Sequence, residues 1–179
     1  MPVHWPFSEK RRMNMKERNV WLIASALGIM AVSQIILCFF LYNQDGLESL
    51  RYVGWITLAI SAVFGWMPIF TLQKKGGVPK RKSYVNTTVL VNSGIYAIVR
   101  HPQYLAGIFL SLALILIAQH WLIAVIGVAA MVLYYAGTPQ EEKGCIEKFG
   151  DDYKRYMQIV PRMNLFAGIM RLLKRRKSE

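Results

Sequence analysis

The chain has 179 residues, of which 54% are hydrophobic and 18% are charged, and its formal net charge is +12. The length suits a single domain. The high apolar fraction and low charged fraction exclude an intrinsically disordered chain and disfavour an ordinary nucleic-acid-binding domain, despite the basic total. Two cysteines, Cys38 and Cys145, are too few for a disulfide framework, and we expect no disulfide. A membrane protein is therefore the first class to test.

Four apolar runs lack Asp, Glu, Lys and Arg, and we interpret them as four transmembrane helices of an all-α integral membrane protein. The first two reach the roughly 20 residues that cross the hydrocarbon core of a bilayer, whereas the last two are shorter. The runs are 20–42, 52–72, 104–118 and 121–136.

Only Gln119 and His120 separate the last two runs, which predicts a tight helical hairpin. Length alone also permits a re-entrant pair or buried helices of a soluble core. We favour two short spans because Trp121 and the pair Tyr134 and Tyr135 stand where interfacial aromatic residues belong.

The basic residues predict the orientation in the membrane. With four crossings, all of the 22 Lys and Arg residues except Arg51 lie on one side. Positive loops face the cytoplasm, so both termini are predicted to be cytoplasmic. The positive charge is then a topology signal that also attracts anionic lipid headgroups, and no nucleic-acid partner is needed to explain it.

These features divide the chain into five segments. A basic tail precedes two transmembrane helices, a cytoplasmic loop, the hairpin, and a cytoplasmic cofactor-binding segment that ends in a basic helix. Their boundaries are 1–19, 20–72, 73–101, 102–136 and 137–179.

Local signals refine the second half of the chain. Pro102 suits the first turn of the third membrane helix. Thr138 and Glu141 fit a capping box, which predicts that a new helix starts at Thr138 and ends at Gly150. Beyond it, Tyr153 and Tyr156 share one helical face, and 165–177 is typical of an interfacial amphipathic helix or a basic tail.

The polar residues argue against transport and for a binding site. Ionisable groups inside a membrane mark ion pathways, and the four runs contain none, so a transporter or channel is disfavoured. Arg100, His101 and Tyr104 instead gather at a helix N-terminus, which favours an anion. Because the hairpin is antiparallel, Glu141 and Glu142 must lie beside them.

Such a pocket suits a zwitterion with a separate positive centre. The carboxylates and aromatic rings would bind a sulfonium or amine, and the arginine would bind a carboxylate. S-adenosylmethionine has this charge pattern. There are two simpler alternatives to a ligand site. Arg100 snorkels to lipid phosphates, and Glu141 and Glu142 only complement the dipole of their helix.

Two segments, GIYAIVRHPQYLAG and TPQEEKGCIEKFGDDYKRYMQIVPR, carry a family resemblance. Together with the apolar hairpin between them, they resemble the isoprenylcysteine carboxyl methyltransferase and phospholipid methyltransferase group of integral-membrane methyltransferases. The resemblance covers 90–162 and implies S-adenosylmethionine as the methyl donor.

The resemblance also implies roles for individual residues. Arg100 and Glu141 match the positions expected to orient the acceptor and act in catalysis. No metal site is implied. The positions that match the cofactor-binding motif are Gly94, Tyr96, His101, Tyr104, Glu141, Glu142, Tyr153, Tyr156 and Arg162. For Tyr153, Tyr156 and Arg162, helix packing is an equal alternative to cofactor contact.

The expected acceptor is a lipid or lipid-modified substrate that arrives from the bilayer. A carboxylate acceptor needs orientation by Arg100 and no base, whereas an amine or thiol must lose a proton to Glu141 or His101. We favour O-methylation of an isoprenylcysteine-type carboxylate over N-methylation of a phospholipid. An isoprenoid or a small thiol also fits, and the oligomeric state stays open.

Two other function classes remain as alternatives. A membrane reductase of the sterol-reductase type shares the RHPxY segment and uses NADPH. A non-catalytic lipid-binding scaffold could keep the fold without activity. The EE pair followed by FGxxYxxY and VPR favours methyl transfer.

Overall fold

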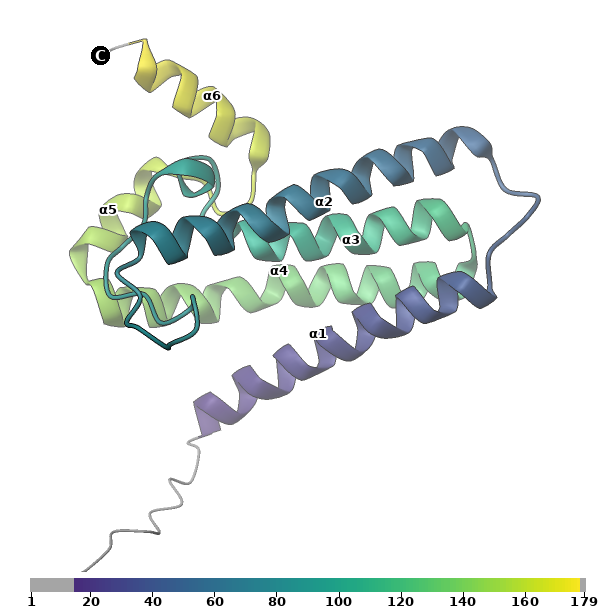
Figure 1. The fold of residues 1–179 in the computed structure, drawn as a ribbon, viewed down its shortest axis with the longest axis horizontal. Helices are drawn as coiled ribbons and strands as arrows, with labels where there is room; N and C mark the ends of the chain where they lie inside the picture. Colours follow the sequence, from purple (N-terminus) through teal and green to yellow (C-terminus); the bar gives the residue numbers. More distant parts are fainter. Residues whose placement is uncertain (1–14, 178–179) are drawn as a thin grey trace, which may run out of the picture.

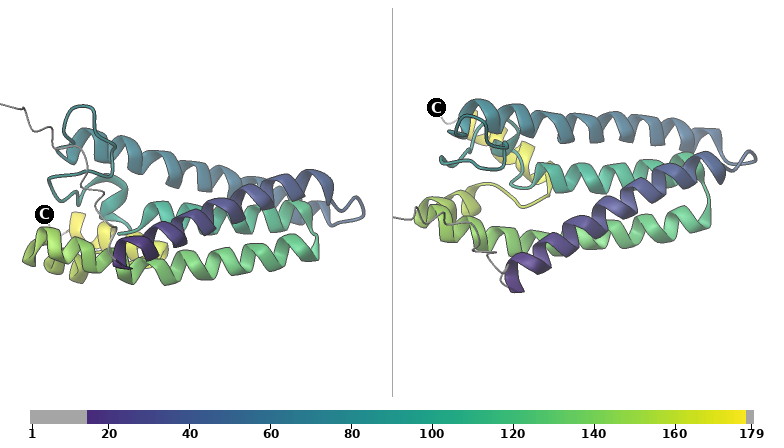
Figure 2. Two further views of the ribbon diagram at one scale, coloured as in Figure 1. Left: turned by 90° about the horizontal axis from the view of Figure 1, so that it is seen from below. Right: turned by 60° about the horizontal axis from the view of Figure 1, so that its bottom comes forward.

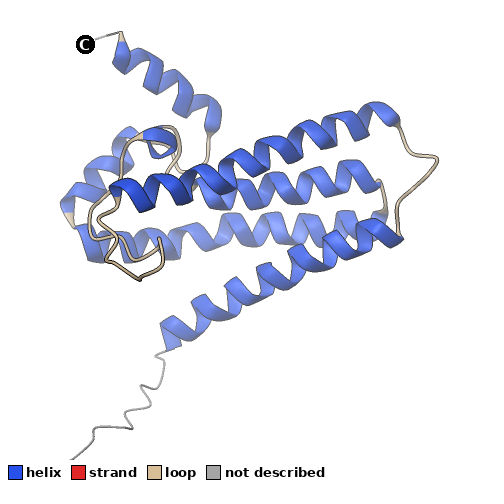
Figure 3. Cartoon of the chain, viewed as in Figure 1, coloured by secondary structure: helices blue, strands red, loops and turns tan. Residues whose placement is uncertain are grey.

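The protein is all-helical in the computed structural model, which describes residues 15–177 (Figure 3). The predicted all-α class is confirmed, because this part of the chain contains no strand. Residues 1–14 of the predicted tail lie outside the described part, and the first helix begins before residue 20. The elements are α1 Met15–Phe40, α2 Glu48–Lys75, the 3-10 helix η1 Gly94–Ala97, α3 Pro102–Ala118, α4 Trp121–Phe149, α5 Asp151–Ile159 and α6 Leu165–Arg176.

Helices α2, α3 and α4 lie side by side, and α1 runs obliquely beside them (Figures 1 and 2). Near its C-terminal end, α1 packs with Leu37 and Cys38 against Leu114 of α3 and Ile123 of α4. Its N-terminal half diverges from the other three helices (Figure 1). Helices α5 and α6 gather at this wider end, together with the segment that links α2 to α3.

Three helices are long and apolar enough to cross a membrane: α2, α4 and the Leu22–Phe40 part of α1. Their surfaces are rich in exposed large apolar side chains, as contact with lipid requires. They support an integral, multi-pass membrane protein. Helix α3 is apolar but has only 17 residues, so the fourth crossing and the cytoplasmic termini stay predictions.

Small residues bring α2 and α3 into close contact. The buried side of α2 consists of Gly54, Thr57, Ser61, Phe64 and Pro68, which recur every three or four residues and therefore share one face. A Cβ on Gly54 would lie 2.7 Å from the side chain of Ile117. The Ser61 hydroxyl donates a hydrogen bond of 2.8 Å to the Ala106 carbonyl. Close backbones and interhelical hydrogen bonds are how membrane helices associate.

The predicted helix start at Thr138 is wrong, because α4 continues through Gly137, Thr138 and Pro139 to Phe149. Pro139 cannot donate to the carbonyl four residues earlier, that of Tyr135. The Thr138 hydroxyl donates to that carbonyl at 2.9 Å instead, so the helix loses one backbone bond without ending. The acids Glu141 and Glu142 therefore sit within α4, not in the first turn of a new helix.

Other predicted boundaries are confirmed. Helix α3 begins at Pro102, and the hairpin turns at Gln119, whose φ is 49°. Gly150, with φ of 59°, ends α4. Cys38 and Cys145 are both free.

Candidate active site

The site begins where the loop enters α3, and the segment after α5 holds that point in place. The backbone N–H groups of Arg100 and His101 donate to the carbonyls of Pro161 and Arg162 at 3.1 and 3.2 Å. Val99, which precedes them, is fully buried. The backbone that carries the Arg100 and His101 side chains is therefore fixed by these hydrogen bonds and by the burial of Val99.

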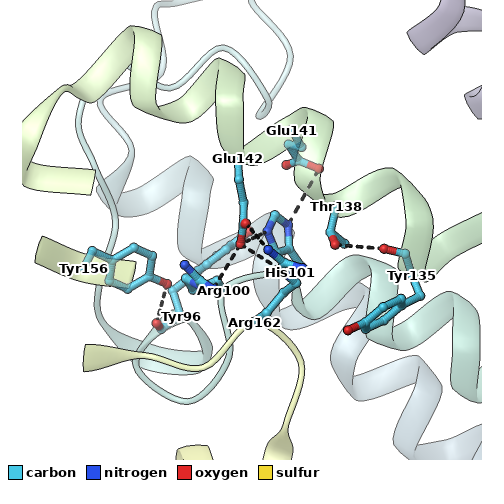
Figure 4. Close-up of polar contacts among 9 residues, drawn as sticks. All are labelled: Tyr96, Arg100, His101, Tyr135, Thr138, Glu141, Glu142, Tyr156 and Arg162. Atoms are coloured by element: carbon cyan, nitrogen blue, oxygen red, sulfur yellow. Dashed lines mark hydrogen bonds and ion pairs between the residues drawn. The ribbon is translucent and has the colours of Figure 1, made fainter. Parts of the chain in front are cut away.

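Glu142 joins three basic side chains at the centre of the site (Figure 4). Its carboxylate lies 3.1 Å from Nη2 of Arg100 and 3.2 Å from Nε2 of His101. Arg162 binds both carboxylate oxygens, through Nε at 3.1 Å and Nη2 at 2.6 Å. The predicted meeting of the basic cluster with the acids across the hairpin is confirmed, and it takes place on a side chain that is only 4% exposed.

Arg100 keeps part of its hydrogen-bonding capacity unused. Its side chain is 8% exposed, and its Nε and Nη1 atoms are buried without a hydrogen-bond partner within residues 15–177. Buried guanidinium groups normally use all their donors. Glu142 is shared between Arg100 and Arg162, so two guanidinium groups pair with one carboxylate. The arrangement is suited to an anionic group beside Arg100.

His101 is held in its neutral form. Burial lowers its pKa below the ordinary value, although the charges of Glu141 and Glu142 act in the opposite direction. A neutral imidazole carries one N–H, and Nε2 is positioned to donate it to Glu142. Nδ1 then faces Glu141 at 3.8 Å, which is too long for a hydrogen bond. Glu141 is 46% exposed and is available to a ligand.

Aromatic rings continue the site along the hairpin. The Tyr104 ring packs edge-on against His101 on one side and Tyr134 on the other, with centroid distances of 5.6 and 6.2 Å. Gly107 makes room for Tyr134, because a Cβ there would lie 2.3 Å from the ring. These rings offer π faces to a cationic ligand.

Helix α5 closes the site from the other side. Tyr153 and Tyr156 share the predicted face, and both are buried, with ring centroids 5.7 Å apart. The Tyr156 hydroxyl donates to the Tyr96 carbonyl at 2.6 Å (Figure 4), which ties α5 to η1. Burial raises the pKa of both tyrosines above the ordinary value, so both hydroxyls stay protonated.

These groups border a cavity of about 1020 Å³. Ligand pockets typically hold roughly 300–1,000 Å³, so there is room for a nucleoside-sized cofactor and part of a second molecule. Of the residues singled out in the sequence, seven line it: Tyr96, Arg100, His101, Tyr104, Glu141, Tyr153 and Tyr156.

Three residues singled out in the sequence do not line this cavity. Glu142 and Arg162 instead hold Arg100 and His101 in place. Gly94 starts η1 with φ of 63°, a backbone conformation that glycine adopts without strain. Its location favours a role in shaping the loop that carries Tyr96.

The sequence did not reveal the apolar wall of the cavity. Ile23 and Leu27 of α1 contribute to it, as do Val89 and Leu90 of the loop. No local motif marks these residues, because a membrane helix is apolar on all sides. Helix α1 is also far from the motifs in the sequence, so the spacing of residues could not predict that it forms part of the cavity wall.

Within residues 15–177, no group of three or more His, Cys, Asp or Glu side chains could hold a metal ion.

Comparison with known proteins gives one family. Residues 55–147 match the isoprenylcysteine carboxyl methyltransferase (ICMT) family, a region that covers α3, most of α2 and nearly all of α4. No curated protein and no solved structure gave a significant match.

Proposed function

Because the chain belongs to the isoprenylcysteine carboxyl methyltransferase family, we propose that it uses S-adenosylmethionine to methylate a membrane-embedded lipid or lipidated substrate. The observation that carries the proposal is the buried Arg100 guanidinium, which lines the cavity with Nε and Nη1 unpartnered among the described residues. Only the combination of unpartnered donors with a neighbouring cavity is suited to an anion, and the family supplies the reaction.

The residues present fit the proposed cofactor. Glu141 and the rings of Tyr96 and Tyr104 would receive its positive centre. The buried tyrosines of α5 would limit the access of water. When bound, S-adenosylmethionine supplies a methyl group on a sulfonium, an electrophile that a carboxylate can attack without losing a proton first.

The favoured acceptor is an isoprenylcysteine-type carboxylate. Arg100 would orient it, while Glu142 and Arg162 hold Arg100 in a fixed direction, and such alignment is the main requirement of a displacement reaction. The apolar wall, which includes Ile23 and Leu27, would accommodate the lipid part. For an amine or thiol acceptor, Glu141 or His101 would be the base, since both line the cavity.

The test uses the purified full-length protein in a lipid bilayer. We expect S-adenosylmethionine to bind and NADPH not to bind, and label from a methyl-labelled donor to pass to an S-prenylated cysteine. A methyl ester releases this label as a volatile product after base treatment. NADPH binding without S-adenosylmethionine binding would overturn the proposal. Base-stable label on an ethanolamine lipid would keep methyl transfer but replace the acceptor.

A further inference from the structure

Helix α6 carries a continuous apolar face that nothing within residues 15–177 covers. Phe166, Ile169, Met170 and Leu173 are 77%, 41%, 54% and 52% exposed. Their spacing of three and four residues puts them on one face of the helix. Four large apolar side chains in one exposed row mark a contact with a partner or a membrane.

The opposite face of α6 is attached to the rest of the protein. Gly168 is buried against the Ile98 carbonyl, where an added Cβ would lie 2.0 Å from the oxygen. Arg171 donates to the Ile159 carbonyl at 3.3 Å, and Arg175 donates to the Ala97 carbonyl at 3.2 Å. The apolar row therefore points away from the protein, and α6 stands apart from the bundle (Figure 1).

The start of α6 lies beside the start of the apolar helix α3. Arg162, shortly before α6, pairs through its backbone with His101, and the apolar helix α3 begins at the next residue, Pro102. Asn164 then caps α6, accepting a hydrogen bond from the Ala167 N–H at 2.9 Å. This connection places the first turn of α6 next to the boundary between hydrocarbon and headgroups.

Basic side chains gather on the side of α6 that faces α5, and of these Lys174 stands nearest the apolar row. Arg171, Lys174 and Arg175 line a shallow cleft of about 380 Å³ with Gln158 and Ile159 of α5. Although Arg171 and Arg175 each donate to a backbone carbonyl, both remain positively charged. A helix that carries both an apolar row and a cleft with three cations matches a lipid with a negatively charged headgroup.

We propose that α6 docks on the surface of the bilayer that the other helices occupy and that its basic cleft binds the headgroup phosphate of an anionic lipid. Phe166, Ile169, Met170 and Leu173 enter the boundary between headgroups and acyl chains. The inference does not depend on methyl transfer, since it rests only on the faces of α6 and their position.

Hydrogen exchange of the full-length protein in nanodiscs tests the inference. One set of discs contains phosphatidylcholine alone, and the other also contains phosphatidylglycerol. We expect the amides of 165–176 to exchange more slowly in the anionic discs. The ratio of the exchange rates in the two kinds of disc should fall by roughly fivefold for each cation removed. This factor corresponds to the attraction of one Lys or Arg to an anionic surface.

The key variants are Lys174→Gln and the pair Arg171→Gln with Lys174→Gln. The single variant is needed because Arg171 also holds α6 to Ile159. The pair Lys80→Gln with Lys82→Gln, in the loop after α2, removes the same charge elsewhere and should leave the difference unchanged. Phe166→Ser with Met170→Ser should accelerate exchange of α6 in both kinds of disc.

Three outcomes would overturn the inference. The first is equal exchange of α6 in the two kinds of disc. The second is an equal effect of the Lys80 and Lys82 variant, which would show a response to net charge alone. The third is full protection by inorganic phosphate in phosphatidylcholine discs, which would make the cleft a site for a free anion.

Discussion

The helix bundle has a narrow end, at the hairpin turn, and a wide end, where α1 diverges from the other helices. Each end holds an arginine, but the two arginines have different surroundings. At the narrow end, Nη2 of Arg51 donates to the carbonyls of Asn43 and Gln44, and its guanidinium lies 4.8 Å from the centre of the Tyr42 ring. At the wide end, Arg100 shares Glu142 with Arg162 and lines the large cavity. Both side chains keep a buried nitrogen without a partner among the described residues, so this feature alone does not identify a ligand site.

The difference lies in what surrounds each arginine. The narrow end is closed by Gln119, whose side chain accepts from the Leu47 N–H at 2.8 Å and donates to the Leu47 carbonyl at 2.7 Å. Gly46 packs tightly against the same side chain. At the wide end, the helices diverge and leave room beside Arg100. An arginine in a closed turn stabilises the chain, whereas an arginine on a cavity can also bind.

The largest expected effect comes from Glu142→Gln. Without this carboxylate, the buried Arg100 loses its counterion, and breaking a buried ion pair costs about 3–5 kcal/mol. We expect the lower end of that range because Arg162 is a third exposed. The measurement is unfolding in detergent by denaturant. Glu141→Gln, the exposed neighbour, should cost less than about 1 kcal/mol, and equal midpoints for the two variants would contradict the proposed role of Glu142.

Arg100→Gln compared with Arg51→Gln separates binding from stability. We expect Arg100→Gln to slow methyl transfer by about 10²–10³-fold, as the loss of a preorganised donor does in other enzymes. Arg51→Gln should lower the free energy of unfolding by about 1–3 kcal/mol and leave the transfer rate of the folded protein unchanged. The comparison of the two ends fails if Arg51→Gln slows transfer as much as Arg100→Gln does.

Gly168→Ala tests how firmly the wide end is held together. Its Cβ would collide with the backbone of Ile98, so α6 must shift, at a cost of about 1–3 kcal/mol. Thermal unfolding and hydrogen exchange of 94–98 measure the effect. Gly144→Ala is the matched control, since its Cβ would meet nothing within 4 Å, and a helical Gly→Ala change is expected to be neutral or stabilising. A Gly168 variant as stable as the parent would show that α6 does not brace η1.

The smallest expected effect is the pH dependence that His101 contributes. Its folded-state pKa is lowered, with burial acting against Glu141 and Glu142, so the unfolded chain takes up the proton first as pH falls. Stability should therefore decrease below about pH 6.5, by at most about 1.4 kcal/mol per pH unit. Denaturant midpoints between neutral and mildly acidic pH measure the slope. His101→Gln should flatten it, and an unchanged slope would assign it to other groups.

The predictable part of the site is the part that one hairpin brings together. Arg100 and His101 directly precede α3, and Glu142 lies in the later part of α4. The antiparallel turn between the two helices is enough to make these residues neighbours. Thr138 was misinterpreted because a capping box and a side-chain bond within a helix use the same residue types. Whether Pro139 ends the helix depends on whether another donor satisfies the Tyr135 carbonyl.

The sequence by itself determined the class of the protein, the hairpin and the acidic and basic residues of the site, because apolar runs, short turns and helical spacing act over short stretches of chain. Only the tertiary structure decided that Glu142 is a buried counterion while Glu141 lines the cavity. It also decided that α1 supplies an apolar wall. These outcomes depend on contacts between segments far apart in the chain, where burial and packing, not local spacing, fix the position of each side chain.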